Sequence, residues 1–229
     1  MYKKVQSFYR LLGLNKQSIA RIDNNISWKS IQKQVKSSID FILKNHKAAN
    51  EEVEKKILWI DLEWLIKKLE DYWAEETFDG LIEDNRYDFE NHILKEDAIF
   101  FRTRETRKKS YITIKKHLDN KEISKDWCSS DNEFELEVNN IEKVIDSILN
   151  LWMEEIKDKK YLKHRISYTL KWVHFDFDKY DNIPWFLEIE SDNEDDVNYW
   201  INKLWIWKYK TVKYWYRKLK ELYHLDKAA

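Results

Sequence analysis

Polar and apolar residues alternate in many short stretches of the chain, and several of these stretches carry charged residues two positions apart. Alternate side chains of a β-strand point to the same face. Each stretch therefore predicts a strand with one apolar face and one face that carries neighbouring charges. The charged sets are Glu52 with Glu54 and Lys56, Arg102 with Arg104, Glu135 with Glu137, Lys163 with Arg165, and Glu188 with Glu190.

Segments with helical periodicity separate these strands. A helix is predicted over 27–45 with Ser27 as its cap. Three further helices are predicted to begin at Asp61, Asn140 and Asp192, and a final helix is predicted over 211–222. Strands are predicted over 52–59, 98–105, 110–116, 133–138, 161–170, 172–177 and 185–191, and 75–90 is expected to be extended around a turn at Gly80. Strands that follow one another in this hairpin-like way predict an antiparallel α+β fold.

Charge divides the chain into two regions. Residues 1–47 carry ten Lys and Arg against two Asp, a net charge of +8, whereas the remainder carries 31 basic and 40 acidic residues, a net charge of −9. We therefore expect a basic helical amino-terminal extension over 1–48 and a main domain over 49–225. The basic extension leaves a nucleic-acid partner open without favouring it.

The small numbers of glycine and cysteine exclude several kinds of site and fold. Gly13 and Gly80 are the only glycines, so the chain cannot form a phosphate-binding P-loop or a dinucleotide fingerprint, both of which need clustered glycines. Side chains must therefore bind any phosphate. Cys128 is the single cysteine, which excludes an internal disulfide framework. With no membrane-span pattern and no signal-peptide pattern at Met1, we expect a cytoplasmic protein that is not bound to a membrane.

The charged faces need an explanation, because a buried charge is costly unless it is compensated. The predicted helices offer apolar stripes that can cover the apolar faces of the strands. The charged faces can then line the interior of an antiparallel eight-stranded β-barrel, which is wide enough for one small ligand. Such a lining is stable only if opposite charges and bound ions balance it.

The charged motifs resemble the CYTH superfamily, also called triphosphate tunnel metalloenzymes, which includes class IV adenylyl cyclases and thiamine triphosphatases. The resemblance runs from about Glu51 to Leu222. Two features depart from the family, which usually has glycine where this chain has Pro184-Trp185 and Trp152-Met153. The matching residues are Glu52, Glu54 and Lys56; Asp84, Tyr87 and Asp88; Arg102 and Arg104; Thr113 and Lys115; Glu135 and Glu137; Lys163, Arg165 and Tyr168; Asp176; and Phe186, Glu188 and Glu190.

The resemblance implies that basic residues bind a triphosphate and that carboxylates bind Mg²⁺ or Mn²⁺, which prefer oxygen ligands. The triphosphate would contact Lys56, Arg102, Arg104, Lys115, Lys163, Arg165 and, with less support, Lys210. The metal ligands would be Glu52, Glu54, Asp176, Glu188 and Glu190, while Glu135 and Glu137 would hold a second metal or balance charge. Catalysis would depend most on Glu52, Glu54, Lys56 and Arg104.

The expected activity is metal-dependent hydrolysis of a triphosphate, namely inorganic tripolyphosphate, a nucleoside triphosphate or thiamine triphosphate. Three alternatives stay open. The first is a class IV adenylyl cyclase that makes cyclic AMP and pyrophosphate from ATP. The second is a non-catalytic sensor that binds nucleotide or polyphosphate, and the third is an RNA 5′-triphosphatase.

The chain is rich in tryptophan, with 12 in all. Helical spacing favours core packing for Trp64, Trp73, Trp152 and Trp200. For Trp205, Trp207 and Trp215, packing at one end of a barrel is favoured over stacking on a substrate base.

Overall fold

The computed structural model describes residues 28–118, 128–212, 219, 222 and 223 of the chain. Residues 1–27 of the expected amino-terminal extension lie outside these residues, as does Trp215. Among the described helices, none is long and apolar enough to cross a membrane.

The strands form one antiparallel sheet with the hydrogen-bonded order β5-β4-β3-β2-β6-β7-β8-β1-β9. An additional pairing of β5 with β1 closes a ring of eight strands, and β9 extends from β1. The expected α+β class with a closed antiparallel eight-stranded barrel is therefore confirmed. The strands are β1 (Ala49–Ile57), β2 (Glu75–Phe89), β3 (Ile99–Thr106), β4 (Ser110–His117), β5 (Ser129–Val138), β6 (Met153–Leu170), β7 (Val173–Tyr180), β8 (Ile183–Ser191) and β9 (Thr211–Val212).

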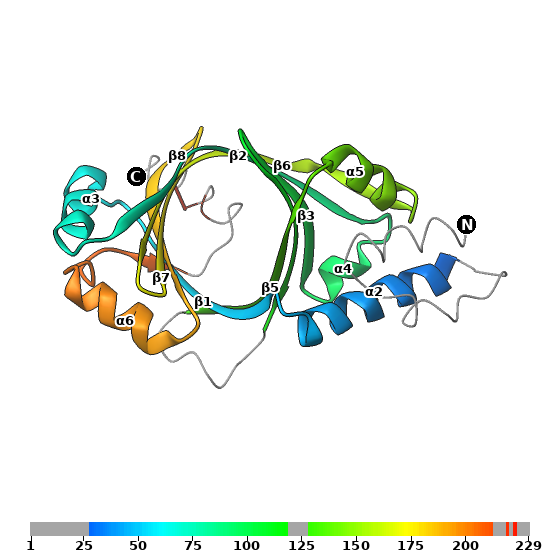
Figure 1. Ribbon diagram of the computed structural model, residues 1–229, viewed down its shortest axis with the longest axis horizontal. Coiled ribbons are helices and arrows are strands. Elements are labelled where there is room, and N and C mark those ends of the chain that lie inside the picture. The colour runs from blue at the N-terminus through cyan, green and yellow to red at the C-terminus, as the bar shows by residue number, and fades with distance from the viewer. Residues whose placement is uncertain (1–27, 119–127, 213–218, 220–221, 224–229) are drawn as a thin grey trace. The chain divides into compact units, whose positions relative to one another are not determined.

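Two compact units divide the chain, and the first, unit 1, comprises Met1–Asn50, Glu83–Lys116 and Asn132–Tyr161. Its helices are α2 (Trp28–Asn45), α4 (Ile93–Glu96) and α5 (Ile141–Leu149). They lie on the same side of β3 and β5 (Figure 1). Ile39 of α2, Val144 of α5 and Phe101 of β3 belong to one buried cluster, so the apolar faces of these strands are covered by helices.

The second, unit 2, comprises Glu51–Ile82, His117–Asp131 and Leu162–Ala229. Its helices α3 (Leu62–Asp71) and α6 (Glu194–Lys203) lie beside β7 and β8 (Figure 1). Leu65 of α3 and Val197 of α6 share a buried cluster with Phe175, Phe177 and Ile189. Because these strand residues alternate with charged ones, the opposite face of β7 and β8 carries the charges.

The predicted helix starts are close to the observed ones. Asp61 and Asn140 accept hydrogen bonds from the backbone N–H groups of Trp64 and Lys143, as expected for side-chain caps. Helix α6 is capped by Asn193, one residue after the predicted start at Asp192.

Three details of the predicted elements were wrong. Gly80 lies inside the continuous strand β2, so no turn interrupts it. The predicted 211–222 helix does not begin at residue 211, where the short strand β9 pairs with Lys56 and Ile57 of β1, but the described residues Leu219 and Leu222 are helical. The strand predicted from residue 133 begins four residues earlier, at Ser129.

Tryptophan packing was predicted only in part. Trp200 is buried, and Trp64 is partly buried against the same core. Trp73, Trp152, Trp205 and Trp207 are exposed, against the prediction that they pack inward. The first three follow helices at positive φ values of 64°, 62° and 61°. Glycine usually occupies this position, and a residue with a Cβ atom costs roughly 1–2 kcal/mol there.

The burial of phenylalanine in unit 1 gives a direct test of the core. Phe101 is 1% exposed, whereas Phe41 on α2 is 50% exposed. We expect Phe101→Ala to lower the free energy of unfolding by about 3–5 kcal/mol, because it removes transfer energy and leaves a cavity. Phe41→Ala should cost less than about 1 kcal/mol, because its ring is half solvated. Urea denaturation followed by circular dichroism measures both, and equal losses would contradict this core.

Candidate functional site

A network of charged residues occupies one face of four strands of unit 2. Antiparallel pairing places Glu54 opposite Glu190 and Lys56 opposite Glu188 across β1 and β8. The next pair of strands places Asp176 opposite Glu188. Residues that are directly opposite in an antiparallel pair share a face. The register therefore gathers charges from separate segments of the chain into one cluster, as the alternation predicted.

Three carboxylates of this cluster are close enough to share a cation. One oxygen each from Glu54, Glu188 and Glu190 lie within 4.8 Å of one another. Glu54 and Glu188 are buried and Glu190 is partly buried. Like charges opposite each other destabilise a sheet, so this arrangement needs positive charge nearby.

Lys56 supplies part of that positive charge. Its Nζ lies 2.6 Å from Glu54 Oε1 and 3.0 Å from Glu188 Oε1. The side chains of the Glu-x-Glu-x-Lys motif thus meet on one face of β1. The motif also contains Glu52, which is only partly buried at the start of the same face.

Arg165 connects the carboxylates of β7 with those of β8. Its Nη2 donates to Glu188 Oε2 at 2.8 Å, and its Nη1 donates to Asp176. Its Nε and Nη2 also donate to the two oxygens of Asp178, each at 2.6 Å. Lys163 Nζ lies 2.5 Å from Asp178 Oδ2. Asp178 therefore fixes both cations of the Lys163-x-Arg165 pair.

The two glutamates of β8 have opposite electrostatic environments. Burial opposes ionisation of Glu188, but Lys56, Lys163 and Arg165 outweigh it and hold the pKa of Glu188 well below its usual range. Burial and the nearby carboxylates of Glu52 and Asp176 raise the pKa of Glu190 well above its usual range. The cluster therefore contains one firmly ionised carboxylate beside one that tends to keep a proton.

This donor set suits a hard divalent cation. Mg²⁺ and Mn²⁺ prefer oxygen ligands, and the three converging side chains offer carboxylate oxygens alone. The raised pKa of Glu190 points the same way, because it reflects negative charge that a bound cation would neutralise. Glu54, Glu188 and Glu190 are the residues that could hold such an ion.

Unit 1 contains a second charged cluster on β2, β3, β4 and β5. Asp84 accepts from Arg104 Nε at 2.9 Å and from Arg102 Nη1 at 3.3 Å. Lys115 Nζ lies 3.1 Å from Glu133, and Glu135 accepts from Thr113 Oγ1 at 2.9 Å. The predicted cations Arg102, Arg104 and Lys115 are therefore brought together with carboxylates in this unit.

Two predicted site residues have other surroundings. Glu137 is exposed, and its Oε2 lies 2.8 Å from Lys109 Nζ, which favours charge balance over metal binding for this residue. Lys210 is also exposed, and its Nζ lies 4.7 Å from the centroid of the Trp59 ring. A phosphate-binding role for Lys210 remains a prediction.

Sequence reasoning missed the role of two acids, one buried and one partly buried. Asp178 is 0% exposed, and Glu133 pairs with Lys115 and Arg102. Both extend charged pairs at a spacing of two, Asp176-x-Asp178 and Glu133-x-Glu135-x-Glu137. The spacing of two was thus a sufficient signal that these side chains share the charged face.

Comparison with known proteins identifies the fold. No protein-family model and no curated protein matches the chain. A conserved hypothetical protein from Pyrococcus furiosus is 21% identical with a TM-score of 0.57, covering 73% of this chain and 99% of that one. A candidate adenylate cyclase from Vibrio parahaemolyticus is 16% identical with a TM-score of 0.58, covering 75% and 98%.

A third solved structure also shares the fold. It is a candidate adenylyl cyclase from Hippeastrum described as having a dominant triphosphatase activity. It is 11% identical to this chain with a TM-score of 0.52, covering 75% of this chain and 95% of that one. At these identities the likeness shows a common fold, which is the barrel expected from the motifs.

The contacts of Asp178 predict a large effect on stability. Asp178→Asn should lower the free energy of unfolding by about 3–5 kcal/mol, because it removes a buried negative charge from between Lys163 and Arg165. Asp79→Asn is the matched control, because the exposed pair of Asp79 with His164 should contribute less than about 1 kcal/mol. Chemical denaturation of both variants tests this difference, and similar losses would contradict the role of Asp178.

The raised pKa of Glu190 predicts how pH affects metal binding. Between its ordinary value of 4.5 and its raised pKa, the folded protein keeps a proton that the unfolded chain releases, so rising pH lowers stability through this group. Mn²⁺ must displace this proton, so it should raise Tm by at least about 3 °C at pH 8 and by less at pH 5.5. Glu190→Gln should reduce the shift at pH 8. Equal shifts at both pH values would contradict the assignment.

Proposed function

We propose that this protein is a divalent-metal-dependent triphosphatase of the CYTH type. The observation that carries this proposal is the mixed cluster of unit 2, in which Glu54, Glu188 and Glu190 converge beside Lys56 and Arg165. Carboxylates alone would suit a metal and cations alone a polyanion, whereas their combination suits a metal-bound polyphosphate. The fold shared with a protein of dominant triphosphatase activity supports this assignment.

In this mechanism the cations bind the phosphate chain. Lys56, Lys163 and Arg165 contribute three positive charges within the cluster of unit 2, and Arg165 offers a forked set of donors that fits phosphate oxygens. Their present partners, Glu54, Glu188 and Asp178, hold them in place before substrate arrives. Such preorganised cations stabilise the charge that develops on the transferred phosphoryl group.

The carboxylates bind the ion and handle the proton. A bound Mg²⁺ or Mn²⁺ would neutralise charge and polarise the attacking water. Water attacks the terminal phosphorus, the phosphoanhydride bond to the next phosphate breaks, and the water loses one proton. The carboxylates beside the ion would accept that proton; among them, burial and nearby carboxylates raise the pKa of Glu190 above its usual range, which makes it a stronger base than an ordinary glutamate. Glu52, Glu54, Asp176 and Glu188 complete the proposed acidic set.

We also propose that the cations of unit 1 bind the triphosphate, which remains a prediction. Arg102, Arg104 and Lys115 were expected from the family resemblance to bind the triphosphate too. Their guanidinium and ammonium groups are held by Asp84 and Glu133 in the manner described above. Loss of substrate binding in Arg104→Ala would support this role.

Adenylyl cyclisation is the second candidate. The neighbour from Vibrio parahaemolyticus is described as a candidate adenylate cyclase, and the same charged residues suit both reactions. Here the ribose 3′-hydroxyl of ATP attacks the α-phosphorus and pyrophosphate leaves. The substrates of both reactions are small triphosphate-containing molecules. The cytoplasmic location expected from the sequence remains a prediction.

A substrate panel decides between these activities. The full chain is incubated with Mg²⁺ or Mn²⁺ and with tripolyphosphate, ATP, GTP, thiamine triphosphate or 5′-triphosphorylated RNA. We expect release of inorganic phosphate. Cyclic AMP with pyrophosphate would instead identify a cyclase, and tight binding without any product would identify a sensor and overturn the proposal.

Variants of the acidic and basic residues test the proposed site. Glu54→Ala and Glu190→Ala should lower kcat by about 100-fold or more, because each removes a proposed metal ligand. Arg104→Ala should weaken both binding and turnover. Glu154→Ala, which removes an exposed glutamate at the start of β6, is the control and should leave both unchanged. Unchanged rates in the first three variants would refute the assignment.

A further inference from the structure

Unit 2 has a group of exposed aromatic side chains that the charged cluster does not use. Trp205 and Trp207 are 65% and 62% exposed, and Tyr199 is exposed as well. Scattered exposed aromatics are ordinary, whereas several that line one hollow indicate a binding surface. This group is therefore a candidate for a second site.

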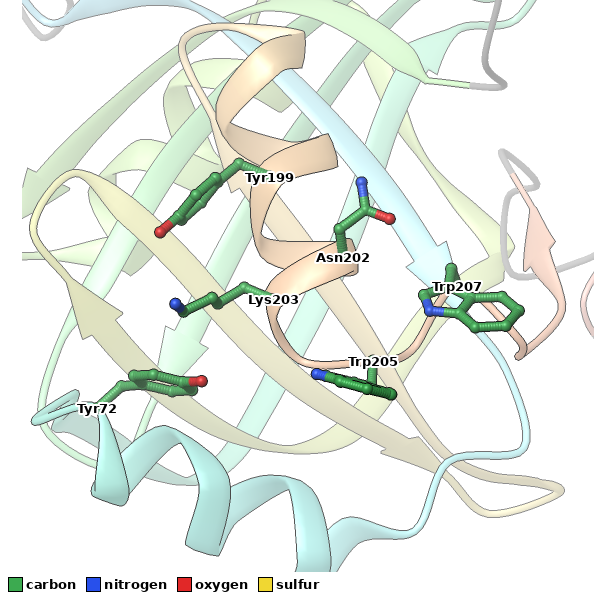
Figure 2. Close-up of a pocket in the computed structure, with 6 residues that line it drawn as sticks. All are labelled: Tyr72, Tyr199, Asn202, Lys203, Trp205 and Trp207. Atoms are coloured by element: carbon green, nitrogen blue, oxygen red, sulfur yellow. The ribbon is translucent and has the colours of Figure 1, made fainter.

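The exposed rings line a cavity of about 460 Å³ whose walls are Tyr72, Tyr199, Asn202, Lys203, Trp205 and Trp207. Figure 2 shows Tyr199, Asn202 and Lys203 projecting from α6, with Trp205 and Trp207 on the segment after it. A neighbouring hollow of about 500 Å³ shares Tyr72, Tyr199 and Lys203 and adds Lys171 and Trp172. We call the two hollows together the aromatic groove.

The backbone is strained at Trp205, as it is at Trp73 and Trp152. Trp205 has φ 61°, a left-handed conformation that favours glycine. Its ring remains mostly exposed, so core packing does not offset the strain. Strained residues that packing does not explain occur preferentially at functional sites. What sets Trp205 apart from Trp73 and Trp152 is that its exposed ring lines a hollow beside other aromatic rings.

The charges of the groove suit a polyanion. Lys203 Nζ lies 5.6 Å from the centroid of the Tyr72 ring, and Lys171 Nζ lies 5.6 Å from that of Trp172. Asp196, the acidic residue that lines the second hollow, accepts hydrogen bonds from Trp172 Nε1 at 2.5 Å and from Asn193 Nδ2 at 2.8 Å. Two ammonium groups beside aromatic faces thus stand against one carboxylate, which leaves the lining of the groove with a net charge of +1.

We propose that the aromatic groove binds single-stranded nucleic acid. Successive bases stack on Trp205 and Trp207, and backbone phosphates lie near Lys203 and Lys171. Base stacking on aromatic side chains combined with nearby cations is the general mode of single-strand binding. The two hollows that share three residues match an extended ligand with several bases.

Other ligands fit these observations less well. A free mononucleotide needs a site that encloses most of its surface, but these rings are more than half exposed. A lipid bilayer accepts side chains that protrude from a surface, whereas these line hollows. A proline-rich peptide also binds aromatic grooves, but it gains nothing from Lys203 and Lys171.

Fluorescence anisotropy tests the proposal. The probe is a labelled ten-nucleotide oligouridine with a 5′-hydroxyl, so it carries no triphosphate, and the buffer contains no divalent metal. We expect Trp205→Ala and Trp207→Ala each to weaken binding by about tenfold or more, because each removes a stacking platform. Lys203→Ala should lower the slope of log affinity against log salt by about 0.7. Trp205→Phe should retain most of the affinity, which distinguishes stacking from a loss of folding.

Trp152→Ala is the matched control. Trp152 also follows a helix at positive φ and is 38% exposed, but it lies in unit 1 and does not line the groove. Its substitution should leave oligonucleotide affinity unchanged. Equal effects of Trp152→Ala and Trp205→Ala would overturn the proposal, because the effect would then not belong to the groove.

Competition separates this proposal from the triphosphatase proposal. Tripolyphosphate with Mg²⁺ should not displace the oligonucleotide, and Glu54→Ala should bind it normally. Displacement would show that the oligonucleotide occupies the charged cluster, which overturns the groove while leaving the triphosphatase proposal standing. No binding by the oligonucleotide, or groove-dependent binding of a proline-rich peptide or of phosphatidylserine vesicles in its place, would also overturn it.

Discussion

Charge compensation between neighbouring strands is the constraint on which the structure of unit 2 depends. Four strands carry carboxylates and cations on one face, and isolated buried charges of this kind would oppose folding. Arg165 and Asp178 resolve most of the conflict, because Arg165 contacts three carboxylates and Asp178 contacts two cations. The apolar face of the same strands can then pack against α3 and α6 without loss.

The compensation is incomplete at one end of the cluster, and the proposed chemistry depends on this remainder. Glu190 has a raised pKa because burial and nearby carboxylates disfavour its charge, while Glu188 beside it is held ionised by three cations. A divalent ion would complete the balance. The same residues that limit stability in the absence of metal are therefore those that make the cluster suitable for metal and polyphosphate.

Scarcity of glycine affects a different part of the molecule. Three helices are followed by tryptophans in a left-handed conformation that glycine usually adopts. Since the indole rings of Trp73, Trp152 and Trp205 are exposed, these positions add aromatic surface at the cost of backbone strain. At Trp205 that surface becomes the wall of the aromatic groove.

The sequence by itself determined the alternation of the strands, and therefore which residues share the charged face. Spacing alone put Glu54, Lys56, Arg165 and Glu188 on charged faces, because strand side chains repeat every two residues. The antiparallel α+β class followed from the hairpin-like order of the strands. Spacing could not decide which strands are neighbours. Only the tertiary structure placed Glu54 opposite Glu190 and buried Asp178 between Lys163 and Arg165, because strand register depends on pairing across the whole sheet. The tertiary structure likewise showed that Trp205 lies exposed in a groove. Helical periodicity could not predict this, because Trp205 follows the end of α6 and the periodicity does not extend to it.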